Sequence, residues 1–81
     1  MEKQDILKEF GRNLKAERNR KNFSQEKLAE LANLSFFTHI GKIERGEMNP
    51  TLITIVNILI ALDITFEDLL DINKFKNIQD K

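Results

Sequence analysis

Most side chains in this sequence that could bind an anion lie in its first half. Between residues 8 and 46, nine lysines and arginines stand against five acidic residues, whereas residues 47–81 hold three basic and six acidic residues. The net charge of the whole chain is zero, so the positive excess is local. A local positive face is what binding to phosphate groups requires. A solvated surface of mixed charge would have the same composition, and charge alone does not separate the two.

The sequence offers little for catalysis or metal binding. It has no cysteine and a single histidine, His39, so disulfides and thiolate metal sites are excluded and a histidine metal site has almost no support. There is no nucleophile–base–orienter set and no phosphate-binding glycine loop, and the carboxylates stand among lysines at the spacings of helix surfaces. We therefore expect no enzyme activity, no cofactor and no metal ion.

The segment 24–46 predicts two short helices joined by a sharp polar turn. Ser24 can cap the first helix, and Asn33 suits the left-handed conformation that ends one. Ser35 can cap the second helix, and Gly46 is placed to end it. Two helices with so short a connection need neighbours to bury their apolar faces. The second helix has such a face at helical spacing, made by Phe36, Ile40 and Ile43.

Three further helices are predicted around this pair. Apolar residues at helical spacing favour one over residues 4–21, in which Gly11 makes a close contact with another helix plausible. Capping residues favour two more, over 52–62 after Thr51 and over 66–72 after the capping-box pair Thr65 and Asp68. Because no strand alternation appears, we predict an all-α domain of five helices over residues 1–73. Residues 74–81 are predicted to be a polar tail that frays.

The predicted helix over 52–62 is apolar nearly all round. One face suits packing against the core of the chain. A second apolar stripe points away from that core, and we expect this stripe to form the interface of a homodimer. The alternative is that the tail or the first helix covers this stripe. The expected core face comprises Leu52, Ile55, Ile58, Leu59 and Leu62, and the expected dimer interface comprises Ile53, Val56 and Ile60.

An ordered set of short motifs spans most of the chain and resembles the Cro/C1-type (XRE-like) helix-turn-helix regulators. Each motif is weak alone, but the whole set in this order is specific. The resemblance implies a compact five-helix, lambda-repressor-like DNA-binding domain with its helix-turn-helix at the second and third helices. The matching residues are Phe10-Gly11, Arg18, Ser24-Gln25, Leu28-Ala29, Ile40, Ile43-Glu44-Arg45-Gly46, Asn49-Pro50 and Leu52.

The resemblance also assigns roles to individual side chains. The third helix would enter the major groove of double-stranded DNA, with its N-terminal residues nearest the bases. Gln25 would bind a phosphate, and Arg45 would either meet a backbone phosphate or remain in solvent. Arg18 and Glu44 would form a structural ion pair between the first and third helices. The residues expected to face the groove are Phe37, Thr38, His39 and Lys42.

One residue near Phe36 is extra relative to the family pattern. The family has ten residues from the serine of the turn to the glycine after the third helix, whereas eleven follow Ser35 here, ending at Gly46. The cap of the third helix is therefore either Ser35 or Phe36. Of the two adjacent phenylalanines, we expect Phe36 to point inward. Phe37 would then touch thymine methyl groups or fold over the longer turn.

We therefore expect a sequence-specific transcription regulator that binds a roughly palindromic operator as a homodimer. Restriction–modification controller proteins, small phage-type repressors and antitoxins all fit this size. The alternative is an antitoxin or adaptor whose last two helices bind a partner protein. The sequence shows no secretory signal and no apolar run of about 20 residues, so we expect a cytoplasmic protein with no membrane association. No sensor domain is visible, so no small-molecule effector is expected.

Overall fold

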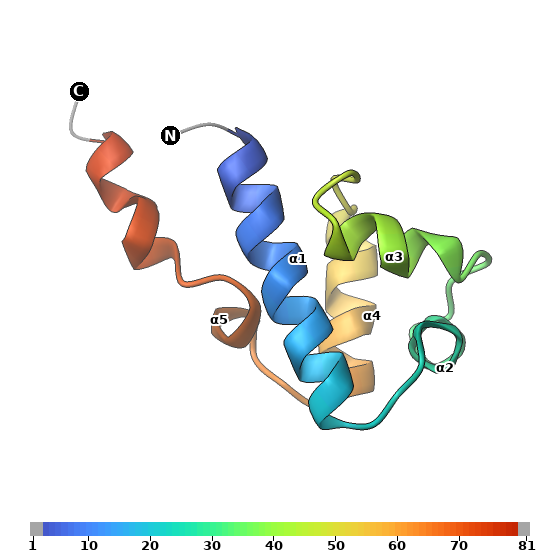
Figure 1. Cartoon of the computed structure of the whole chain (residues 1–81). Helices are drawn as coiled ribbons and strands as arrows, with labels where there is room; N and C mark the ends of the chain where they lie inside the picture. The colour runs from blue at the N-terminus through green and yellow to red at the C-terminus, as the bar shows by residue number, and fades with distance from the viewer. Residues whose placement is uncertain (1–2, 80–81) are drawn as a thin grey trace.

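The computed structural model describes the backbone of residues 3–79 and the side chains of residues 3–76. Within this range the chain is entirely helical apart from turns and loops, and no strand is present (Figure 1). No helix in the described part of the chain is long and apolar enough to cross a membrane. The elements are α1 (Lys3–Arg20), α2 (Gln25–Leu31), α3 (Thr38–Glu44), α4 (Leu52–Leu62), α5 (Phe66–Leu69) and the 3₁₀ helix η1 (Ile72–Gln79).

Local chemistry sets most of the helix boundaries, as the sequence predicts. The Ser24 hydroxyl accepts a hydrogen bond of 2.9 Å from the Lys27 amide and so caps α2. Thr51 caps α4 in the same way, and Thr65 forms a capping box with Asp68 at the start of α5. Left-handed residues follow four of the helices: Asn22, Asn33, Gly46 and Asp63, with φ values of 61°, 59°, 74° and 56°.

The core lies where α1 crosses the other helices. In Figure 1, α1 runs through the middle of the molecule, with α3 and α4 on one side and α5 on the other. α1 packs on α3 and α5, and α2 packs on α3 and α4, so the helix-turn-helix is held from two sides. The largest fully buried side chains come from all five α-helices and are Leu14, Leu28, Ile40, Ile43, Ile58, Leu62 and Leu69.

Gly11 is a point of close approach between α1 and α3. A Cβ atom at this position would meet the Ile43 carbonyl oxygen and would lie 2.5 Å from the Glu44 carbonyl oxygen. Both obstacles are backbone atoms, which cannot turn away as a flexible side chain can. The close helix contact suggested by the sequence is therefore confirmed, and it holds the end of α3 against α1.

The prediction for the end of the fifth helix was wrong. This helix ends at Leu69, three residues earlier than expected, and the chain continues as η1 over part of the predicted tail. η1 is tied to α1 because the Lys74 ammonium donates to the Glu9 carboxylate at 2.8 Å. This hydrogen bond lowers the pKa of Glu9 below its usual value, although desolvation by burial opposes the shift. Residues 80 and 81, the end of the predicted tail, lie outside the described residues.

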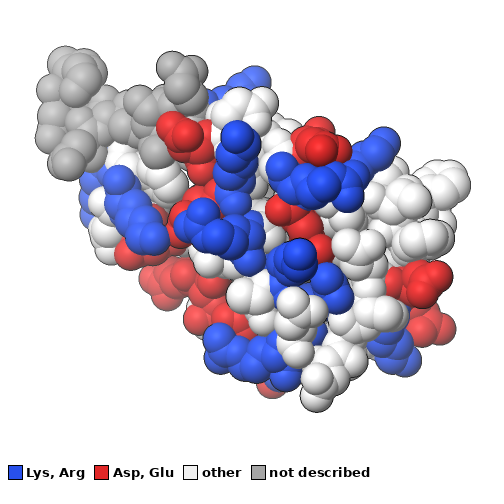
Figure 2. Space-filling model, in the orientation of Figure 1, with Lys and Arg blue, Asp and Glu red and all other residues white. Residues whose placement is uncertain are grey.

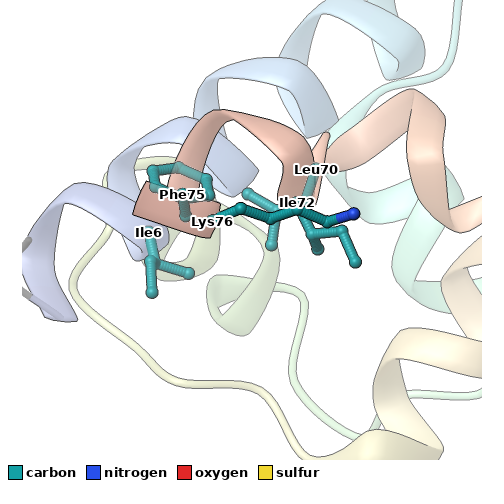
Figure 3. A pocket seen from close by; sticks show the side chains of 5 residues that line it. All are labelled: Ile6, Leu70, Ile72, Phe75 and Lys76. Atoms are coloured by element: carbon teal, nitrogen blue, oxygen red, sulfur yellow. The ribbon is translucent and has the colours of Figure 1, made fainter. Parts of the chain in front are cut away.

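A shallow apolar hollow of about 380 Å³ lies where η1 meets α1. Figure 3 shows Phe75 beside Ile6, with Lys76 extending from η1 toward Ile72. Phe75 and Ile6 are also partly buried against the main core. The polar composition of this segment conceals these apolar contacts, which explains why η1 was not predicted.

One residue of the expected core face of α4 is exposed. Ile58 and Leu62 are fully buried, as predicted, whereas Leu52 is exposed. Leu52 lies one turn before Val56, and residues four apart share a face of a helix. It therefore extends the second stripe, whose residues remain exposed within the described part of the chain. We call this exposed set, Leu52, Ile53, Val56 and Ile60, the α4 stripe.

Candidate nucleic-acid interface

One face of α3 is buried and the opposite face presents polar side chains to solvent. Ile40 and Ile43 are fully buried and fix the rotation of the helix. Thr38, Lys42 and Arg45 are exposed, at spacings of four and three residues, so they lie along one face. Within the described residues Lys42 has no ion pair, so its ammonium group is available to an acceptor such as guanine O6 or N7.

The turn between α2 and α3 differs from the prediction at Phe36. Both phenylalanines are exposed, Phe36 by 62% and Phe37 by 47%, so neither enters the core. Leu34 fills that role instead, since it is partly buried against the core and its amide donates to the Ala29 carbonyl at 2.9 Å. The cap of α3 is Phe37, which has no side-chain acceptor, and neither Ser35 nor Phe36 caps the helix.

His39 contacts an aromatic ring and belongs to no metal site. Its ring packs against that of Phe36, with centroids 5.5 Å apart and an interplanar angle of 58°. In the part of the chain that the structure describes, no group of three or more histidine, cysteine or acidic residues could hold a metal ion. His39 is half-buried at the start of α3, next to the exposed Thr38.

A buried ion pair joins α1 to α3, between the two residues that the family resemblance pairs. Arg18 Nε lies 2.6 Å from Glu44 Oε2, and Arg18 Nη2 lies 3.2 Å from Glu44 Oε1, so the contact is bidentate. The Arg18 side chain is 10% exposed and that of Glu44 is 3% exposed. Arg18 Nη1 also donates to the Phe23 carbonyl at 2.8 Å, which fastens the loop before α2.

Gln25 is part of this network, a contact that the sequence did not reveal. Its side-chain Nε2 donates to Glu44 Oε1 at 3.1 Å, so the first residue of α2 is held directly against the end of α3. Gly41 leaves room for this arrangement, because a Cβ there would lie 3.2 Å from Arg45 Nη1 and 3.4 Å from Gln25. Gln25 is half-buried. Its side-chain nitrogen makes the hydrogen bond to Glu44, and its side-chain oxygen takes no part in that bond.

Five of the nine basic residues between positions 8 and 46 form ion pairs within the described part of the chain. Basic and acidic side chains are interspersed on the face shown in Figure 2. The four basic residues outside these pairs are exposed and could meet phosphates; they are Lys8, Lys15, Lys21 and Lys42. The ion pairs in this region are Arg12–Glu9, Arg18–Glu44, Arg20–Glu17, Lys27–Glu30 and Arg45–Glu47.

Known proteins share both the sequence pattern and this architecture. The helix-turn-helix family model matches residues 14–69. The control protein C.SmaI of Serratia marcescens is 40% identical over 75 residues, which cover 93% of this chain and 88% of that protein.

Two solved structures of restriction–modification controller proteins have a similar fold. C.AhdI from Aeromonas hydrophila is 39% identical with a TM-score of 0.74, over 82% of this chain and 97% of the other. A mutant of C.Esp1396I is 25% identical with a TM-score of 0.72, over 94% of this chain and 95% of the other.

Proposed function

This chain belongs to the helix-turn-helix family of DNA-binding transcription regulators, which are not enzymes, and we propose that it is a restriction–modification controller. In this proposal it binds a roughly palindromic operator as a homodimer and acts in the cytoplasm, where it meets that DNA. Its similarity to control proteins over nearly its whole length supports this assignment above the phage repressors and antitoxins of similar size. No small-molecule effector is needed.

The main support for the proposed homodimer is the exposed α4 stripe. Ile53 and Ile60 are 71% and 72% exposed, which leaves a continuous row of aliphatic side chains in water. Fully burying one such side chain contributes about 1.5–3 kcal/mol. A two-fold axis would pair the stripe with its own copy and would present two α3 helices to successive turns of one DNA duplex.

Sedimentation at micromolar concentration tests the dimer. We expect the wild-type chain to sediment as a dimer, and Ile53→Lys or Ile60→Lys to give folded monomers with weaker DNA binding. Ile72→Lys is a matched control, because Ile72 is also exposed but lies in η1. A wild-type chain that stays monomeric would contradict the homodimer and leave the stripe for a partner protein, as in an antitoxin or adaptor.

We further propose that the exposed face of α3 reads the operator. Phe37, Thr38, His39 and Lys42 would contact base edges in the major groove, and Gln25 with Arg45 would contact backbone phosphates. The exposure of Lys42 and its lack of an ion pair within the described residues support this orientation. Since the Arg45 guanidinium pairs with Glu47 at 3.1 Å, a phosphate would have to compete with that carboxylate.

Selection of bound DNA from a random pool, followed by affinity measurements, tests the orientation of α3. Lys42→Ala should weaken binding to the selected operator by about 1–3 kcal/mol and relax the preference at one position per half-site. Lys76→Ala in η1 removes an equal charge and should leave the preference intact. Gln25→Ala should weaken binding to the selected operator and to random DNA by similar amounts. Unchanged affinity and base preference in Lys42→Ala would contradict the proposed orientation.

A further inference from the structure

The exposed aromatic pair at the start of α3 is not explained by folding. Phe36 and Phe37 both face solvent, although Leu34, in the same turn, packs against the core. A phenylalanine side chain gains about 1.5–3 kcal/mol when it is fully buried, so two exposed rings at successive positions forgo a large favourable term. Such an arrangement is characteristic of a surface that becomes covered when a ligand binds.

The backbone of this pair leads directly into the first turn of α3, whose cap is Phe37. The Phe36 carbonyl accepts from the His39 amide at 3.1 Å, and the Phe37 carbonyl accepts from the Ile40 amide at 3.0 Å. The rings are therefore attached to the end of α3 that lies nearest the bases when such a helix enters the major groove. Figure 2 shows uncharged side chains at the end of the molecule where α3 begins in Figure 1.

The Phe36 ring is oriented without being buried. Its edge-tilted contact with the His39 ring, at 5.5 Å between centroids, restricts its rotation while most of its surface stays in solvent. A ring held in this way loses less conformational freedom on binding than a free one. Thr38 follows Phe37 directly and Lys42 lies one turn further along the same face of α3, so the pair stands at the N-terminal end of the polar face proposed to read bases.

We propose that the Phe36–Phe37 pair recognises the 5-methyl group of a thymine in each operator half-site. The inference rests on the proposed function and names the chemical group that this part of the site takes. The C5 methyl of thymine is the apolar group among the features that base pairs present in the major groove, and aromatic side chains are among its usual contacts. The extra residue in the turn supplies a second ring, which widens the surface around one methyl group.

Replacing thymine by deoxyuridine removes the methyl group and leaves the base-pairing edge unchanged. An operator is first selected from random DNA, and each thymine is then replaced singly while affinity is measured at fixed salt by fluorescence anisotropy. We expect one replacement per half-site to weaken wild-type binding by about fourfold, the change that corresponds to one buried carbon. Replacements elsewhere in the operator should have little effect.

Variants of the two rings connect this methyl effect to the protein. Phe36→Ala or Phe37→Ala should bind the thymine and deoxyuridine operators with nearly equal affinity, because the surface that contacts the methyl group is gone. Phe36→Leu and Phe37→Leu keep a smaller apolar surface and should retain part of the discrimination, even where the alanine variants bind too weakly to measure. Ile72→Ala removes exposed apolar surface from η1 and should discriminate as the wild type does.

The outcomes distinguish this inference from the proposed function. A selected operator that contains no thymine in its half-sites, or that tolerates every deoxyuridine replacement, would overturn methyl recognition while leaving DNA binding intact. Discrimination that persists in all four ring variants would show that other residues sense the methyl group. Failure to enrich any sequence from the pool would contradict the proposed function itself.

Discussion

Removing Glu44 should destabilise the domain severely, because Arg18 would be left as a buried cation with one weak partner. In the folded chain Glu44 receives two hydrogen bonds from Arg18 and one from Gln25. After Glu44→Ala, the remaining hydrogen bond of the Arg18 guanidinium within this network is the one to the Phe23 carbonyl. Glu44→Ala therefore removes the negative charge of the pair, while the positively charged Arg18 side chain remains only 10% exposed.

The expected magnitude follows from this burial. Breaking a buried ion pair on one side costs about 3–5 kcal/mol, whereas a domain of this size has a total stability of roughly 4–12 kcal/mol. Glu44→Ala and Arg18→Ala should therefore each bring the protein close to the limit of folding. The double variant Arg18→Met/Glu44→Leu keeps the volume and removes both charges, so it should be more stable than either single variant.

Urea unfolding followed by circular dichroism at 222 nm measures these differences. The matched control is Arg20→Ala, which removes an arginine of the same helix whose partner is Glu17 at 3.1 Å. Because the Arg20 side chain is 72% exposed, that change should cost no more than about 1 kcal/mol. Equal losses for Glu44→Ala and Arg20→Ala, or strict additivity of the Arg18 and Glu44 changes, would refute the reasoning.

Two further predictions concern the attachment of α1 to its neighbours. Gly11→Ala should lower the free energy of unfolding, measured in urea, by about 1–3 kcal/mol, because the new Cβ meets the backbone of α3. This loss should outweigh the better helix propensity of alanine. A variant more stable than the wild type would contradict the close approach. Lys74→Met should raise the pKa of Glu9 toward its usual 4.5, as followed by NMR titration of the Glu9 carboxyl carbon, and an unchanged titration would rule out Lys74 as the cause. Since the folded-state pKa is lowered, the wild-type contribution is complete above about pH 4.5 and is lost as the pH falls through the folded-state value, so Lys74→Met should reduce this acid dependence.

Features set by local chemistry were predictable from the sequence. The caps at Ser24 and Thr51, the capping box of Thr65 and the bounds of α4 all depend on residues within four positions of each other. The resemblance predicted the long-range contact between Arg18 and Glu44, which residue spacing alone would not have supplied.

The burial of individual side chains depends on which other parts of the chain pack against them, and this was not predictable from the sequence. Phe36 could satisfy an apolar pattern with Ile40, but Leu34 already occupies the inward position in the turn. Leu52 was assigned to the core by its helical spacing to Ile55 and Leu59, but it is the first residue of α4 and its side chain is 74% exposed. η1 was missed because its polar sequence hides the contacts of Phe75 and Lys74 with α1.

The pairing of charges within the chain affects how the proposed dimer would find its operator. Non-specific binding to DNA comes mostly from cations that replace counterions on phosphates, and five of the nine basic residues between positions 8 and 46 already have carboxylate partners. Within the described residues, a single subunit therefore has four exposed lysines in this region to hold it on random DNA. Two subunits joined through the α4 stripe place a second α3 helix at high effective concentration beside its half-site, so each contact to a base is used twice. In the proposed dimer, the exposed apolar stripe of this neutral chain would thus contribute to DNA recognition together with the residues of α3.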